Sequence, residues 1–190
     1  MELENKEQQH LELIADMINV ARKEYSDNSF IYLVWGWSVC LASLAQYVLI
    51  RMGKDYYGIV WLVLIPVAIL HIIFSVRQKR NERVKTHMDK IIGYVWTAVG
   101  ISYGVVGISI SVMQLSAYPV FILLYGVGTF ISGGIMNLKP MKAGAICCWV
   151  IAVVAFHVSF EYQSLLLSLS LVLSYIIPGH LLKNRFKKNV

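Results

Sequence analysis

Six long apolar runs dominate this chain. The hydrocarbon core of a bilayer is about 30 Å thick, and a helix needs roughly 20 mostly apolar residues to cross it. Hydrophobic residues make up 57% of the 190 residues and charged residues only 15%, against about 25% charged in soluble domains. This composition excludes a disordered chain and an ordinary soluble enzyme domain. We therefore predict an all-α polytopic membrane protein with six spans in three antiparallel hairpins, at 30–50, 56–76, 91–113, 118–135, 143–160 and 164–182.

The spans divide the chain into three parts: an acidic segment at 1–28, a transmembrane bundle at 29–182 and a basic tail at 183–190. The first segment is rich in Asp and Glu, unlike the basic start of a secretory signal peptide, so we expect it to remain in the mature protein. Its apolar residues recur at helical spacing, which predicts an amphipathic helix.

The distribution of Lys and Arg predicts the orientation in the membrane. Basic residues concentrate in the cytoplasmic segments of membrane proteins. If the first segment is cytoplasmic, only Arg51 and Lys54 of the 17 Lys and Arg residues fall outside, which leaves 15 inside. We therefore expect both termini in the cytoplasm of a bacterial cell and the spans in its inner membrane. The calculated pI of 9.2 then reflects topology and contact with anionic lipids, and no nucleic-acid partner is expected.

The basic loop between the second and third spans is a predicted docking site for the acidic helix. Opposite charges favour such a contact, whereas a helix meant to lie on anionic lipid should itself be basic. The alternative is that the acidic helix docks on a cytosolic protein partner or on a second copy of the chain. The loop carries Arg77, Lys79, Arg80, Arg83 and Lys85.

The third predicted span carries a stripe of small residues, spaced so that they share one helix face. Small residues let helix backbones approach closely in lipid. We expect them to pack against a similar set on the fourth span; a sliding or gating contact and a homodimer seam are the alternatives. The third-span stripe is Gly93, Thr97, Gly100, Gly104, Gly107 and Ser111, and the fourth-span set is Gly126, Thr129 and Gly133.

Three titratable side chains are candidate polar or pH-sensitive sites. His157 and Glu161 lie four residues apart at the outer end of the fifth span, and on a continuous helix they would form a charge-assisted pair. His71 lies in the inner third of the second span. The alternatives are that His157 and Glu161 cap a helix end, and that His71 is a hydrogen-bonded packing residue.

The sequence contains no constellation that indicates catalysis, a cofactor or a metal. No charged residue lies in the central two-thirds of a span, which disfavours ion-coupled transport. The three cysteines form no CxxC motif, so we expect them to pack as small apolar residues. The sixth span carries hydroxyl side chains that could either form hydrogen bonds between helices or line a polar path. These are Ser164, Ser168, Ser170, Ser174 and Tyr175.

Three short motifs resemble those of a group of small six-span bacterial inner-membrane proteins with no assigned activity. These are Trp35-Gly36-Trp37, Glu161-Tyr162-Gln163 and Ile177-Pro178-Gly179. The resemblance covers most of the chain. Members of the group are often encoded beside a small winged-helix regulator, which implies a role in a regulated envelope response but assigns no role to any residue.

These observations lead to two functional expectations. The first is a non-enzymatic assembly, scaffold or regulatory protein that acts through its cytoplasmic helix and basic loops. The second is a small passive channel or transporter with a path lined by Ser and Tyr. A dry, close-packed bundle would favour the first, and a continuous polar cavity would favour the second.

Overall fold

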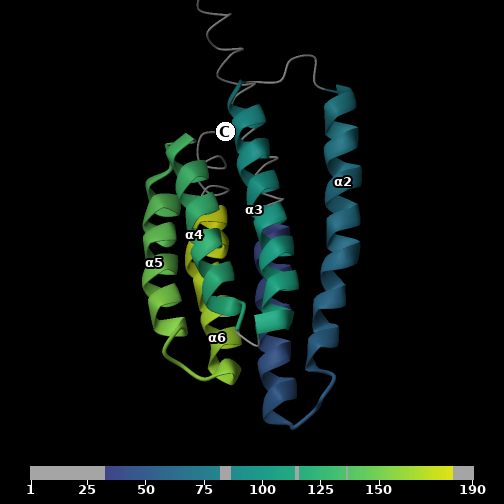
Figure 1. Ribbon diagram of the computed structural model, residues 1–190. Coiled ribbons are helices and arrows are strands. Elements are labelled where there is room, and N and C mark those ends of the chain that lie inside the picture. The colour runs from purple at the N-terminus through teal and green to yellow at the C-terminus, as the bar shows by residue number, and fades with distance from the viewer. Residues whose placement is uncertain (1–32, 82–86, 114–115, 136, 182–190) are drawn as a thin grey trace, which may run out of the picture.

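The computed structural model describes residues 33–81, 87–113, 116–135 and 137–181 (Figure 1). A first helix, Leu33–Arg51, is followed by the 3-10 helix η1, Tyr57–Val63, which leads into α2, Leu64–Asn81. The remaining elements are α3 (His87–Met113), α4 (Tyr118–Ile135), α5 (Lys139–Ala155), α6 (Phe160–Leu171) and the π-helical turn η2 (Val172–Ile176). All regular structure among the described residues is helical, which confirms the predicted all-α class.

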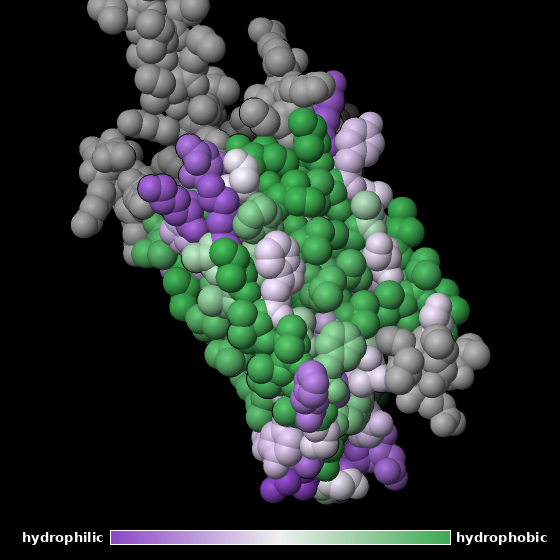
Figure 2. Space-filling view, turned by 60° about the vertical axis from the view of Figure 1, so that its left-hand side comes forward, coloured by the Kyte–Doolittle hydropathy of each residue, from purple (hydrophilic) through white to green (hydrophobic). Residues whose placement is uncertain are grey.

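Five helices are long and apolar enough to cross a membrane. They are Leu33–Arg51, Tyr57–Phe74, Lys90–Ser109, Tyr118–Ile135 and Phe160–Leu181. On the face shown in Figure 2, hydrophobic residues cover most of the surface, and strongly hydrophilic residues gather toward its two ends. This surface is compatible with a multi-pass membrane protein.

The helices run roughly parallel to one axis, alternately up and down (Figure 1). The end of α2, the start of α3 and the turn between α4 and α5 all lie toward the top of this view. We call this end of the bundle the Lys139 end. The turn after the first helix lies at the bottom, and we call this the Arg51 end. In the same view, α2 stands apart from α3, whereas α4, α5 and α6 form a compact group.

The fifth helix differs from the predicted span at 143–160. It begins at Lys139, with Pro140 in its first turn, and it ends at Ala155. Proline suits the first helical turn because its missing N–H would have no partner there. Hydropathy alone placed the start after Lys142, although a lysine can extend its ammonium group toward water from within a helix.

The sixth helix accordingly begins at Phe160, four residues before the predicted start at Ser164. Ser159 has extended backbone angles (φ −64°, ψ 153°) and separates the two helices. Glu161 therefore lies in the first turn of α6, where the helix dipole favours a negative charge.

The sixth helix widens into the π-helical turn η2 just before Pro178. The amide of Ile177 donates to the carbonyl of Val172, five residues earlier. Pro178 has no N–H, and its ring would crowd the carbonyl of Ser174 in a regular α-helix. The wider turn accommodates the proline, and the last turn, through Leu181, continues as α-helix.

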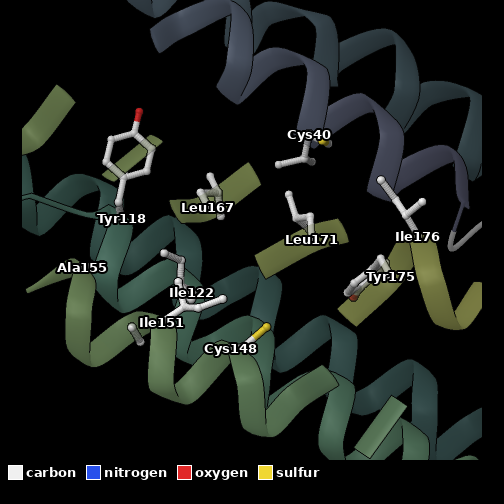
Figure 3. Packing of buried hydrophobic residues seen from close by; sticks show 12 residues of the cluster. Cys40, Tyr118, Ile122, Cys148, Ile151, Ala155, Leu167, Leu171, Tyr175 and Ile176 are labelled. Atoms are coloured by element: carbon white, nitrogen blue, oxygen red, sulfur yellow. The ribbon is translucent and has the colours of Figure 1, made fainter. Parts of the chain in front are cut away.

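The buried core lies where the first helix, α4, α5 and α6 converge. Figure 3 shows side chains from these helices pointing toward one another around Ile122, Cys148 and Leu171, all fully buried. Cys40 lies 3.5 Å from the hydroxyl of Ser168 across the first helix and α6. The helices outside this group contribute few buried residues: no residue of the Tyr57–Phe74 window is buried.

Candidate functional site

Gly126 and Gly133, the two glycines predicted to form the small face of the fourth span, lie against α5 and not against α3. A Cβ added at Gly133 would lie 2.8 Å from the Cβ of Met141, and one at Gly126 would lie 3.2 Å from the carbonyl oxygen of Ala145. Real Cβ atoms essentially never come closer than 3.0 Å to a nonbonded heavy atom. The small face of the fourth span therefore packs closely, as expected, but with a different partner from the one predicted.

The small stripe of α3 faces outward, and the predicted packing of this stripe against the fourth span is wrong. An added Cβ at Gly93, Gly100, Gly104 or Gly107 would meet nothing within 4 Å. Thr97 is also exposed, and its hydroxyl donates to the carbonyl of Gly93 in its own helix. The side chain of Ser111 lies outside the described part. Within the described chain the stripe has no packing partner.

Large aromatic side chains, not small ones, join α3 to α4. The indole N–H of Trp96 donates to the hydroxyl of Ser132 at 3.1 Å, and the rim of the indole ring lies against Gly128. The ring of Tyr103 packs edge-on against Phe121, with 5.0 Å between centroids. These rings turn the adjacent face of α3 inward, and this rotation leaves the glycine stripe outside.

The predicted pair of His157 and Glu161 does not form, because the two residues are not on one helix. The ring of His157 lies 2.8 Å from the carbonyl oxygen of Val153, beside the end of α5. Glu161 lies in α6 and pairs with Arg51 at 3.5 Å. The contact of His157 with a carbonyl near the end of α5 agrees with the alternative that it caps a helix end. The ion pair of Glu161 instead joins α6 to the end of the first helix.

His71 accepts a hydrogen bond from the first helix. The indole N–H of Trp35 donates to its Nδ1 at 3.0 Å, and the two rings pack edge-on with 6.0 Å between centroids. The contact agrees with the hydrogen-bonded packing role. It also fixes which nitrogen of the imidazole carries the proton, because an indole N–H can only donate.

A buried glutamine outside every predicted site connects three elements. Gln46, on the first helix, is 2% exposed. Its Oε1 accepts from the indole N–H of Trp61 at 2.8 Å and also from the hydroxyl of Tyr118. The signal in the sequence was an uncharged amide within an apolar run, since a buried amide needs hydrogen-bond partners from neighbouring helices.

The serines of the sixth helix are buried, but their hydroxyls bond mainly within their own helix. Ser174 donates to the carbonyl of Ser170, and Ser170 donates to that of Leu167, both at 2.7 Å. The thiol of Cys148 also approaches the carbonyl of Ser170, at 3.7 Å. Such back-bonded hydroxyls present few free polar groups to a path.

A close backbone contact adjoins these serines. A Cβ added at Gly144 would lie 2.6 Å from the carbonyl oxygen of Leu173 and 2.7 Å from the Cα of Ser174. The backbone of α5 thus touches the backbone of the π-helical turn. Tyr175, in the same turn, packs edge-on against both Trp96 and Tyr125, with centroids 5.9 and 5.4 Å away.

The predicted amphipathic helix at 1–28 lies outside the described residues, and so do residues 82–86 of the basic loop. The rest of the predicted loop is helical: α2 continues through Asn81 and includes Arg77, Lys79 and Arg80. Of the loop's basic residues, Arg77 is described to its side chain and is exposed. At the same end of the molecule, Lys139 is also exposed. Among the described residues, no three His, Cys, Asp or Glu side chains lie together as a metal-binding group.

Comparisons with protein-family models, curated proteins and solved structures found no significant match.

Proposed function

We propose that the chain is a non-enzymatic integral membrane protein with six spans, which acts as an assembly or regulatory protein and not as a conduit. The observation that carries this proposal is the contrast between the closed contacts of α4, α5 and α6 and the apolar exterior. Gly133 and Gly144 bring backbone and Cβ atoms together, which leaves little room for water between these helices.

In this proposal α5 is the sixth span. Its 17 residues extend about 26 Å at 1.5 Å per residue, close to the thickness of a bilayer core of about 30 Å. Ile146, Val150 and Val153 are exposed on its outer side, as expected for contact with lipid. Lys139 and Lys142 stand at its start, where a headgroup region would surround them.

The Lys139 end is the cytoplasmic end in this proposal. It gathers the described basic residues Arg77, Lys90 and Lys139, whereas Arg51 and Lys54 lie at the opposite end. Cysteines introduced at Asn81 and Asn184 should therefore label only from the cytoplasmic side, and one at Gly53 only from outside. Periplasmic labelling at Asn81 would overturn this orientation.

The bundle gives less support to the passive channel than to an assembly protein. The hydroxyls of Ser170 and Ser174 donate to carbonyls of their own helix, and both side chains are buried, so they line no open path for a passing ion or solute. Purified protein in liposomes should accordingly add no flux of ions or small neutral solutes above that of empty liposomes. A reproducible flux would favour the channel.

The acidic segment at 1–28 and the basic loop are the proposed contact sites for a second copy or a cytosolic partner. Removal of residues 1–25 should leave the bundle inserted, because every predicted span and most of the Lys and Arg asymmetry persist. The truncated protein should, however, lose its assembly state or its co-purifying partner. Charge reversal at Arg80 and Arg83 should have the same effect. Unchanged assembly and recovery after truncation would contradict the proposal.

A further inference from the structure

The helix formed by η1 and α2 is held to the first helix by side-chain hydrogen bonds at two levels. Near the Arg51 end, the indole N–H of Trp61 donates to Gln46 at 2.8 Å. Nearer the Lys139 end, the indole N–H of Trp35 donates to His71 at 3.0 Å. No residue in the Tyr57–Phe74 window is buried, so this helix has no fully buried face, and these bonds contribute directly to its attachment.

The second bond requires a neutral imidazole. An indole N–H is a donor only, so Nδ1 of His71 must present its lone pair, and the ring proton must be on Nε2. A second proton would occupy Nδ1, and two N–H groups would then face each other. The first bond has no such requirement, because an amide oxygen does not take up a proton in the physiological range.

The two described helices that form this contact carry no group that would stabilise a positive charge on His71. Neither the first helix nor the stretch from Tyr57 to Asn81 contains an Asp or Glu. The titratable groups of the first helix are Cys40, Tyr47 and Arg51; Cys40 faces Ser168, and Arg51 pairs with Glu161 at the far end. On the histidine's own helix, Arg77 follows toward the Lys139 end and carries charge of the same sign. Protonation therefore costs the hydrogen bond and gains no ion pair within the described chain.

We infer that the Trp35–His71 contact is a pH-sensitive attachment that holds α2 to the first helix in its neutral form and releases it on acidification. Histidine is the side chain whose charge ordinarily changes between about pH 5 and pH 8. On protonation, the ring leaves Trp35 and moves toward the headgroup region, since a charge is less costly there than within the apolar layer. The Lys139 end of α2 then separates, while Trp61 and Gln46 hold the other end. This inference is independent of the proposed function.

The test is a pair of distances measured between spin labels in the full-length protein, reconstituted in lipid. One pair, Leu41→Cys with Leu70→Cys, reports on the half of α2 that contains His71. The other pair, Val48→Cys with Leu62→Cys, reports on the half held by Trp61. All four side chains are exposed. The background lacks the native cysteines, with Cys148→Ser retaining a donor toward the carbonyl of Ser170.

Between about pH 8 and about pH 5, the first pair should gain a longer and broader distance population, and the second pair should stay unchanged. His71→Asn should abolish the shift, because its amide oxygen accepts the indole N–H and cannot be protonated. Trp35→Phe should show the longer distance at both pH values. If Trp35→Phe fails to fold, the inference is still tested by comparing the pH-dependent distance shift of the protein with His71 and that of His71→Asn. An unchanged first distance at low pH, or an equal shift in His71→Asn, would overturn the inference.

Discussion

The glycines of α3 and those at the contacts of α4 and α5 share a residue type and helical spacing, yet their surroundings are opposite. Gly104 has no heavy atom within 4 Å of an added Cβ, whereas Gly144 has the backbone of Leu173 at 2.6 Å. A small residue permits close approach but does not provide the attraction. The side that packs is chosen by neighbouring large side chains, such as Trp96 and Tyr103, because they make hydrogen bonds and ring contacts with α4.

The helix formed by η1 and α2 differs from α4 in the same way, because one is closely packed and the other is not. Half of the α4 window is buried, against none of the Tyr57–Phe74 window, although both are strongly apolar. Apolar side chains gain nothing from leaving lipid for other apolar side chains, so close packing and hydrogen bonds must hold membrane helices together. α4 has both, whereas the helix formed by η1 and α2 has hydrogen bonds, such as that from Trp61 to Gln46, but no fully buried face. The following substitutions test this contrast, beginning with the largest expected effect.

Gly144→Leu should be the most destabilising of these substitutions. The new side chain would meet the backbone of Leu173 and Ser174, which cannot move without disturbing the π-helical turn. We expect a loss above about 4 kcal/mol, or no folded protein, measured by unfolding in detergent micelles.

Gly104→Leu is the matched control, because its position is open. It should change the stability of the monomer by less than about 0.5 kcal/mol. A loss comparable to that of Gly144→Leu would show that the outward face of α3 is packed after all.

Gln46→Leu should cost about 2 kcal/mol. It removes the acceptor that serves both Trp61 and Tyr118, and leaving a buried donor unpaired costs about 1–3 kcal/mol. Trp61→Phe removes one donor instead of the shared acceptor and should cost less in the same unfolding measurement. Equal losses would mean that the bond to Tyr118 contributes nothing.

Thr129→Val should be neutral or stabilising by up to about 1 kcal/mol. The hydroxyl of Thr129 is fully buried and has no hydrogen-bond partner among the described residues, and valine has nearly the same shape without that polar group. Ser43→Ala is the control: its hydroxyl donates to the carbonyl of Val39 at 2.9 Å, so its removal should destabilise. A clear loss in Thr129→Val would indicate that the hydroxyl has a partner, such as a buried water.

Arg51→Ala should have the smallest effect. Its pair with Glu161 is 3.5 Å long, and the side chains are 57% and 33% exposed, so water and salt screen the attraction. We expect a loss below about 1 kcal/mol that disappears at high salt. A larger loss that persists in salt would mean that the Arg51 end depends on this pair more than on Gln46.

Much of the fold could be predicted from hydropathy because a helix in lipid must satisfy its own backbone. The fourth helix has the predicted bounds, Tyr118 to Ile135. The boundary between the fifth and sixth helices was predicted less well, since apolar residues continue through the turn after Ala155. There α5 ends at Ala155, and the extended backbone of Ser159 precedes the start of α6; hydropathy does not register this change in backbone angles.

The sequence by itself determined the helical class, the apolar exterior and the accumulation of basic residues at one end, because these follow from composition and from the position of charges along the chain. Only the tertiary structure decided which face of α3 points inward, that Glu161 pairs with Arg51, and that Gln46 and His71 receive indole N–H groups. Those outcomes depend on the rotation of each helix about its axis. Rotation is set by the volumes and hydrogen bonds of residues distant in the chain, and local periodicity leaves it open.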